Sequence, residues 1–208
     1  IFGYLTNFFL QGQSLSGKAA LVTAGPTYEN IDPVRFIGNY SSGKMGVALA
    51  KALAERGCAV ELILGPSALS IEHPLIHTRR VRSADEMYTE SMAVFPSVQI
   101  AIMSAAVADY TPVEVSDEKI KKKGDELVIH LRKTRDILKE LGSTKQSHQV
   151  LIGFALESNN ETDYALKKLN EKNADAIVLN SLRDAGAGFA HDTNKITIFD
   201  KAGKSYPF

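Results

Sequence analysis

A regular alternation of strand-like and helix-like segments most strongly constrains the fold. Short apolar runs lie at residues 18–24, 59–64, 99–107, 150–156 and 176–179. Segments with apolar residues at helical spacing lie between or after them, at residues 43–56, 83–94, 135–141 and 160–172. This alternation predicts right-handed crossovers, and so an α/β, Rossmann-like, doubly wound, mostly parallel sheet with helices on both faces.

Two further segments alternate apolar and polar residues. Residues 127–131 predict a strand of a flap hairpin, and residues 195–199 predict an antiparallel strand that closes the sheet edge. We expect one domain over residues 17–208, preceded at 1–16 by a linker from an upstream domain. Such folds bind ligands at the carboxyl ends of their strands. The loops after residues 24, 107 and 156 are therefore the places to search for a site.

The composition argues against several classes of partner. The 24 basic and 24 acidic residues balance to zero, so no net field draws the chain to nucleic acid or to an anionic membrane. No apolar run reaches the ~18 residues that span a bilayer. Cys58 is the only cysteine, which fits a reducing compartment. We expect a cytoplasmic protein with no nucleic-acid or membrane partner, and Cys58 as a small buried apolar residue.

The segment from Gly38 to Met45 is the first candidate site. Two hydroxyls and two glycines precede a helix N-terminus, where backbone N–H groups and the helix dipole favour a phosphate or a carboxylate. A capped helix with a solvated Ser41-Ser42 turn would show the same pattern. The segment is not a P-loop, because Met45 stands where a magnesium-binding hydroxyl is required and the preceding strand ends well upstream.

Two groups of lysines could bring positive charge to such an anion. Residues 119–123 hold four lysines in five positions, which suits either a solvated hairpin loop or a cationic flap over phosphates. Lys168 and Lys172 are i, i+4 neighbours on a predicted helix, and a polyphosphate between them would relieve their repulsion. An ordinary exposed helix face would also carry this pair.

Other patterns are absent from the sequence. Gly25-Pro26-Thr27 follows the first strand, where a dinucleotide-binding protein would carry G-x-G-x-x-G. The five histidines show no metal-ligand spacing. A nucleotide-binding oxidoreductase-like Rossmann module and a non-catalytic regulatory domain stay open as alternatives, although both are disfavoured.

Six motifs then occur in an order that resembles a known family. They are TAGPT at 23–27, DPVR at 32–35, NYSSGKMG at 39–46, AAVADY at 105–110, KIKK at 119–122 and GFALE at 153–157. The family is phosphopantothenoylcysteine synthetase, also called phosphopantothenate–cysteine ligase, and the resemblance covers about residues 17–205. In many bacteria this enzyme is the C-terminal half of a bifunctional coenzyme A biosynthesis protein. The other half is a flavin-dependent phosphopantothenoylcysteine decarboxylase.

The resemblance implies a reaction in two steps. The carboxylate of 4′-phosphopantothenate attacks the α-phosphate of CTP, which gives an acyl-cytidylate and pyrophosphate. The amine of L-cysteine then displaces CMP. The resemblance also implies Mg²⁺ with the triphosphate through unknown ligands, a homodimer, and no flavin in this part of the protein.

Roles for individual residues follow from the same resemblance. Asn39 would hold the acyl intermediate and donate to its carbonyl oxygen, and Lys119 would be a catalytic flap lysine. The nucleotide contacts would be Ala105, Ala106, Asp109, Asp136, Ile137, Phe154, Lys168 and Lys172. The phosphopantothenate contacts would be Arg35, Ser41, Ser42, Gly43 and Met45, near the dimer interface. One departure is Thr134-Arg135, where many bacterial members carry Asn-Pro.

Overall fold

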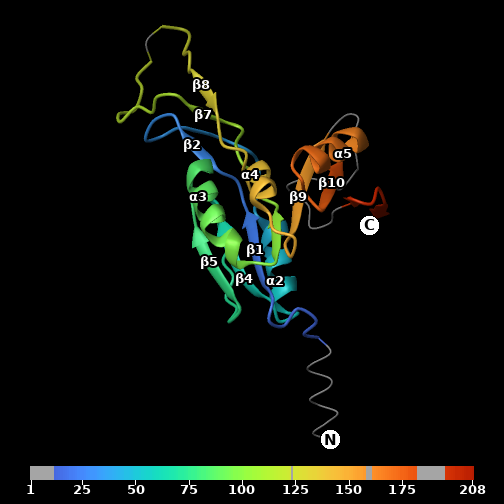
Figure 1. Cartoon of the computed structure of the whole chain (residues 1–208). Coiled ribbons are helices and arrows are strands. Elements are labelled where there is room, and N and C mark those ends of the chain that lie inside the picture. Colours follow the sequence, from blue (N-terminus) through green and yellow to red (C-terminus); the bar gives the residue numbers. More distant parts are fainter. Residues whose placement is uncertain (1–11, 123, 158–160, 182–194) are drawn as a thin grey trace, which may run out of the picture.

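The computed structural model of the chain describes residues 12–122, 124–157, 161–181 and 195–208. Its centre is an eight-stranded sheet in the order β12-β11-β10-β9-β6-β1-β4-β5 (Figure 1). The strands are β1 (Ala19–Ala24), β4 (Ala59–Leu64), β5 (Ile76–Arg80), β6 (Ile100–Met103), β9 (Val150–Glu157), β10 (Ala176–Ser181), β11 (Ile196–Asp200) and β12 (Ser205–Pro207). Within this sheet β10, β9, β6, β1, β4 and β5 pair in parallel, and β11 and β12 are antiparallel additions. The predicted fold class is confirmed.

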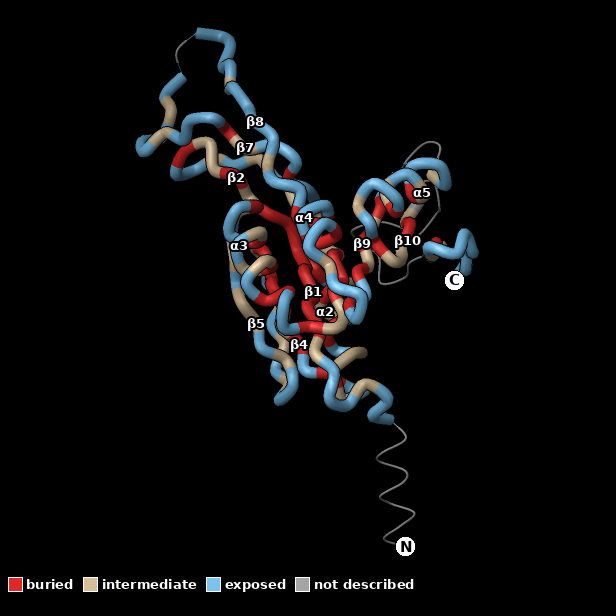
Figure 2. Tube along the Cα trace, viewed as in Figure 1, coloured by how far each residue is buried: buried red, intermediate tan, exposed pale blue. Residues whose placement is uncertain are grey.

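Helices cover both faces of this sheet. They are α2 (Lys44–Ala54), α3 (Ala84–Val94), α4 (Ile137–Thr144) and α5 (Glu161–Glu171), and a short 3₁₀ turn, Phe95–Ser97, follows α3. Successive strand residues point to opposite faces, so β1 serves two cores. Leu21 packs with apolar residues of α3, α4 and α5, whereas Ala20 and Val22 pack with α2. Figure 2 shows the buried residues following the central strands.

Cys58 belongs to the core on the α2 side. Its residue is fully buried, as predicted, and burial raises the pKa of its thiol. No helix within the described ranges is long and apolar enough to cross a membrane.

A long arm projects beyond the sheet. It consists of the hairpin β2 (Tyr28–Asn30) and β3 (Phe36–Gly38), the antiparallel pair β7 (Tyr110–Pro112) and β8 (Leu131–Lys133), and the connection between β7 and β8. Figure 1 shows the arm extending past α3. We call residues 113–130 the arm loop, with residue 123 outside the described part. Most of its residues are exposed, so its position depends on a few polar contacts (Figure 2).

Some predicted elements differ from the structure. The strand predicted at 127–131 is wrong, because β8 begins only at Leu131 and both Leu127 and Val128 face solvent. The strand predicted at 195–199 exists as β11, but β12 and not β11 forms the edge. The predicted linker lies outside the described residues up to residue 11, and the predicted helix start at Asn160 lies outside them too.

Candidate active site

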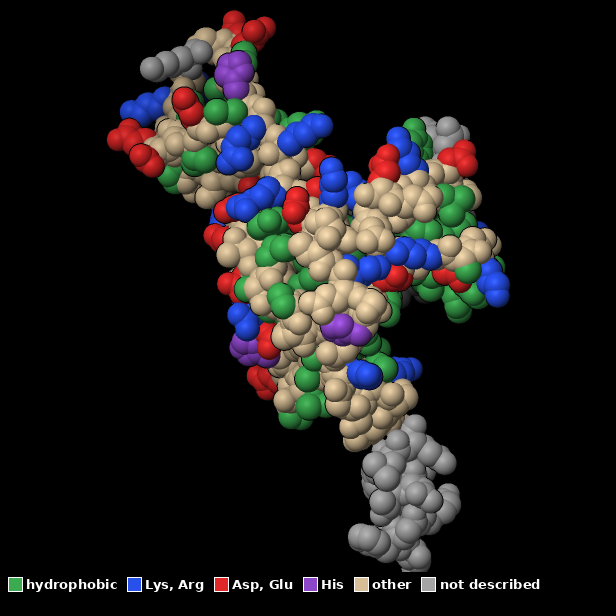
Figure 3. Space-filling model, in the orientation of Figure 1, with side chains coloured by type: hydrophobic (Ala, Val, Ile, Leu, Met, Phe, Trp, Pro, Cys, Tyr) green, Lys and Arg blue, Asp and Glu red, His purple; other side chains and the backbone are tan. Residues whose placement is uncertain are grey.

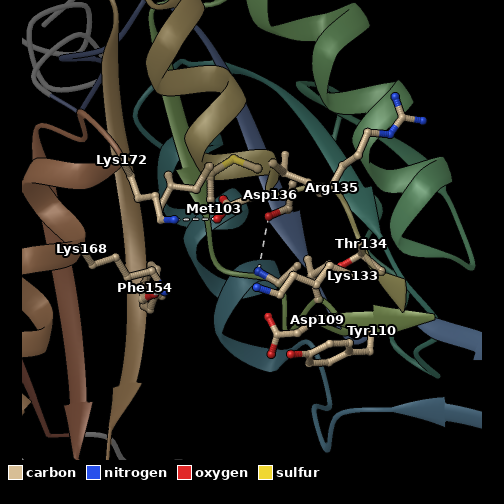
Figure 4. A pocket seen from close by; sticks show the side chains of 15 residues that line it. Met103, Asp109, Tyr110, Lys133, Thr134, Arg135, Asp136, Phe154, Lys168 and Lys172 are labelled. Atoms are coloured by element: carbon tan, nitrogen blue, oxygen red, sulfur yellow. Dashed lines mark hydrogen bonds and ion pairs between the residues drawn. The ribbon is translucent and has the colours of Figure 1, made fainter. Parts of the chain in front are cut away.

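A cleft of about 590 Å³ opens at the carboxyl ends of β1 and β6 (Figure 4). The loop after β6 forms one wall, the junction of β8 with α4 forms a second, and β9 with α5 forms a third. The lining residues are Thr23, Met103, Ala105, Val107, Asp109, Tyr110, Lys133, Thr134, Arg135, Asp136, Ile137, Leu138, Phe154, Lys168 and Lys172. The structure therefore gathers every predicted nucleotide contact except Ala106 around one cavity.

Positive charge dominates the lining of this cleft. Lys133 enters it from β8, and Lys168 and Lys172 enter it from α5 and the turn that follows α5, opposite only two carboxylates, Asp109 and Asp136. In Figure 3, Lys and Arg side chains recur on this face between the arm and α5. Lys168 Nζ donates to the carbonyl of Phe154 at 2.8 Å, so its position is set by β9. An anion with several charges suits this arrangement better than a neutral ligand.

Asp136 holds the α4 wall and one of these lysines together. One carboxylate oxygen accepts from the Lys139 backbone N–H at 2.9 Å and so caps α4, and the other accepts from Lys172 Nζ at 2.6 Å. Burial by itself would raise the pKa of Asp136, but the bonds from Lys172 and Lys139 outweigh it and the pKa is lowered. The ionised carboxylate thus fixes Lys172 at the rim of the cleft.

The loop after β6 is shaped by the end of β1. The buried hydroxyls of Thr23 and Thr27 accept from the backbone N–H groups of Ala105 at 3.3 Å and Ala108 at 2.9 Å. Ala106 donates to the Gly25 carbonyl at 2.9 Å and accepts from the Thr27 N–H at 3.3 Å, so its backbone is engaged inside the protein. These contacts explain why the TAGPT and AAVADY motifs belong together.

Asn39 lies next to the same loop. Its side-chain amide donates to the carbonyl of Val107 at 2.9 Å, and the Asn39 residue itself is exposed. Gly38 makes this approach feasible, since a Cβ there would lie 2.8 Å from the Thr27 carbonyl. The predicted catalytic amide is therefore one hydrogen bond from a residue that lines the cleft.

The predicted anion seat at the start of α2 is a separate feature. Gly43 has a φ of 81° and precedes the helix. A Cβ on Gly43 would lie 3.3 Å from the Gly25 nitrogen, and the Ser42 carbonyl accepts from Ser67 Oγ at 2.7 Å. Ser41, Ser42, Gly43 and Met45 do not line the cleft, but Gly25 connects their loop with the loop after β6.

Two predicted residues lie on the arm and away from the cleft lining. Arg35 pairs with the buried carboxylate of Asp32, and Lys119 is exposed on the arm loop. Neither Arg35 nor Lys119 is among the residues that line the cleft.

Several lining residues were not predicted as site residues, among them Tyr110, Lys133 and Arg135. The guanidinium of Arg135 lies 4.0 Å from the centre of the Tyr88 ring and pairs with Asp85. Figure 4 shows its side chain reaching toward α3 and away from the cleft. Lys133 could have been suspected from its place beside Asp136 in the sequence, whereas the contacts of Arg135 depend on α3.

Comparison with known proteins agrees with this architecture. Residues 15–208 match the family model described as DNA/pantothenate metabolism flavoprotein C-terminal domain. The chain is 54% identical over 90% of its length to a protein of an unknown prokaryotic organism named Cysteine/Cysteine sulfinic acid decarboxylase, of which it covers 52%. It is 48% identical over 91% of its length to the Coenzyme A biosynthesis bifunctional protein CoaBC of Bacillus subtilis (strain 168), of which it covers 46%.

A solved structure supports the same relationship. The crystal structure of the C-terminal domain of a Coenzyme A biosynthesis bifunctional protein CoaBC superimposes with a TM-score of 0.79 at 43% identity. The match covers 94% of this chain and 88% of that one. The chain spans about half the length of the curated relatives it matches. The resemblance seen in the motifs is confirmed, and the chain belongs to the family of DNA/pantothenate metabolism flavoprotein C-terminal domains.

Proposed function

We propose that this chain is a CTP-dependent ligase that joins 4′-phosphopantothenate to L-cysteine and gives 4′-phosphopantothenoylcysteine, CMP and pyrophosphate. Relatives that bear the name Coenzyme A biosynthesis bifunctional protein CoaBC support a role in coenzyme A biosynthesis. The observation that carries the proposal is the convergence of Lys133, Lys168 and Lys172 on one cleft, with the amide of Asn39 bonded to its wall.

In the first step a carboxylate oxygen of phosphopantothenate forms a bond to the α-phosphorus of CTP. The bond to the β-phosphate breaks, and pyrophosphate leaves with the electron pair. Negative charge grows on the leaving phosphates in this step. Lys168 and Lys172 lie on one wall of the cleft and Lys133 on another, so they can surround a triphosphate and stabilise that charge.

In the second step the amine of cysteine attacks the acyl carbon. A C–N bond forms, the bond from carbon to the cytidylate oxygen breaks, CMP leaves with its electron pair, and the amine proton passes to solvent. The carbonyl oxygen becomes negative on the way. The amide of Asn39 is a suitable donor to that oxygen, in exchange for its present acceptor at Val107.

Mg²⁺ fits this cleft as an ion carried by the triphosphate. Asp109 offers a carboxylate at the lining, while the carboxylate of Asp136 is engaged with Lys172 and Lys139. Within the described ranges no cluster of three or more acidic, histidine or cysteine side chains could hold a metal alone. Magnesium commonly binds through one or two carboxylates, waters and phosphates, where it neutralises phosphate charge.

We further propose a cytoplasmic homodimer, with this chain joined in the full-length protein to a flavin-dependent decarboxylase and binding no flavin itself. The arm supports the dimer, because it exposes apolar residues that a second copy could cover. They are Val34, Phe36, Val113, Val115, Leu127, Val128 and Leu131.

The test is a pyrophosphate-release assay with CTP, phosphopantothenate and Mg²⁺, with and without cysteine. We expect release that depends on phosphopantothenate, and CMP formation that depends on cysteine. A parallel reaction with ATP tests the nucleotide preference. An oxidoreductase-like module would instead bind a dinucleotide and release no pyrophosphate, and absence of release under all these conditions would exclude the ligase.

A further inference from the structure

A buried carboxylate on the arm holds the arm loop. The side chain of Asp32 lies in the turn between β2 and β3 and is 0% exposed. Its Oδ1 accepts from the backbone N–H groups of Val34 and Arg35, both at 2.8 Å. Its Oδ2 accepts from Arg35 Nε at 2.9 Å and from a second nitrogen of the same guanidinium. A fully buried charge needs such compensation.

The Asp32–Arg35 pair also binds a residue far along the chain. Asp32 Oδ2 accepts from the backbone N–H of Ile120 at 3.1 Å, and Arg35 Nη2 donates to the carbonyl of Ile120 at 2.9 Å. Both polar backbone groups of one arm-loop residue are therefore bound by one ion pair. The Ser116 N–H adds a bond to the Ile31 carbonyl at 3.0 Å. We call the contacts of Asp32 and Arg35 with Ile120 the latch.

The latch fixes the backbone position from which two lysine side chains extend. Lys119 and Lys121 flank Ile120, so holding both groups of that residue restricts where their charged ends can reach. The other side of the latch continues through β3 to Asn39. Bonds to ionised groups are also stronger than those between neutral groups.

We propose that Asp32 is a positioning residue that, through Arg35 and Ile120, sets the basic segment Lys119–Lys122 in register with the loop carrying Asn39. The effect on catalysis rests on the ligase function proposed above. A purely structural Asp32 would stabilise the hairpin β2–β3 without influencing the lysines, and the two roles separate experimentally.

The first measurement is limited digestion by a lysine-specific protease under native conditions, scored after Lys121 and Lys122. Cleavage there requires local opening. Two variants break the latch. Asp32→Asn removes the buried charge, and Ile120→Pro removes the donor N–H of a half-buried residue on the arm loop. We expect cleavage to rise about tenfold in both, since each loses a charge-assisted bond.

Matched controls keep the latch intact. Ile120→Ala retains the backbone donor and acceptor. Glu29→Gln changes another buried carboxylate of the same hairpin, one whose oxygen accepts from the Ala84 N–H at 2.8 Å and so faces α3. Both should cleave at the wild-type rate. Ile120 lies outside the core, so Ile120→Pro decides the question if Asp32→Asn fails to fold, and unchanged cleavage in that variant would overturn the latch.

The second measurement separates kcat from KM in the pyrophosphate-release assay. Ile120→Pro should lower kcat about tenfold, because the basic segment Lys119–Lys122 is no longer positioned to stabilise negative charge in the transition state. It should leave the KM for cysteine unchanged. Faster cleavage with an unchanged kcat would overturn the positioning role. A wild-type protein without pyrophosphate release would refute the ligase function, and the cleavage rates would still decide whether the latch exists.

Discussion

Lys172 has two competing partners in the proposed reaction, the carboxylate of Asp136 and the phosphates of the nucleotide. Removing its charge with Lys172→Met should weaken binding of magnesium–CTP by about tenfold or more, because one phosphate contact is lost and the carboxylate is left uncompensated. Titration calorimetry measures this directly. Lys167→Met is the matched control, since Lys167 is exposed on the same helix and lies 3.8 Å from the Glu171 carboxylate. Equal losses in both variants would remove Lys172 from the site.

At the scale of residues, the sequence identifies the charged groups of the site better than it identifies the buried polar groups that hold the site's loops in place. The i, i+4 spacing of Lys168 and Lys172 pointed to a shared face, and both line the cleft. The hydroxyls of Thr23 and Thr27 carried no such signal. Their role depends on burial against a loop 81 or 82 positions away, which only the folded topology determines.

At the scale of elements, the fit of α2 against the sheet can be tested through Gly46. A Cβ on Gly46 would lie 2.4 Å from the Ala24 Cβ and 2.7 Å from Ser104 Oγ. Gly46→Ala should therefore destabilise the protein by about 1–3 kcal/mol, even though alanine favours helices by up to about 1 kcal/mol. Urea unfolding measures the change. Gly12→Ala, which meets no atom within 4 Å, should be close to neutral, and a stabilised Gly46→Ala would contradict the packing.

Strands were predicted correctly where the sequence pattern matches the position of the strand in the sheet. The central parallel strands are buried on both faces and read as continuous apolar runs, so they were found. β5 was not predicted, because it lies at the sheet edge and only Ile76 of its five residues is apolar. Its polar residues, Arg79 and Arg80 among them, are tolerated at an edge. The strand predicted at residues 127–131 does not form over residues 127–130, although their apolar and polar residues alternate. Its apolar side chains have no core to pack against.

At the scale of the whole molecule, the arm determines the proposed assembly. Val128, in the arm loop, is 74% exposed. If a second copy covers the arm, Val128→Lys should weaken the dimer by about 1–3 kcal/mol, which is about 5- to 150-fold in the dissociation constant. Analytical ultracentrifugation over a range of concentrations measures it. Leu75→Lys changes an exposed apolar residue beside β5 and should leave the association unchanged. A wild-type protein that is monomeric at all concentrations would refute the proposed dimer.

Stability against acid is also a property of the whole molecule, and Asp175 contributes to it. Its carboxylate accepts from Lys145 Nζ and from the Leu151 N–H, all at 2.7 Å. Burial would raise the pKa of Asp175, but these bonds lower it overall. A lowered folded-state pKa means that this contribution is present above the unfolded value of about 3.9 and is lost as the pH falls through the folded value.

Asp175→Asn should therefore cost about 1–3 kcal/mol at pH 7. Its deficit relative to the wild type should shrink below about pH 4. Urea unfolding at both pH values checks the sign. Asp163→Asn, on the exposed surface of α5, should change little at either pH. A deficit that grew on acidification would contradict this role.

The burial of Cys58 gives the protein a practical property. Its thiol is shielded from solvent, its pKa is raised, and no other cysteine exists in the chain. A thiol introduced on the exposed arm, as in Glu118→Cys, would therefore react selectively with a maleimide dye or spin label without prior removal of the native cysteine. Distances from such a probe to a labelled nucleotide would then report directly how the arm lies during turnover.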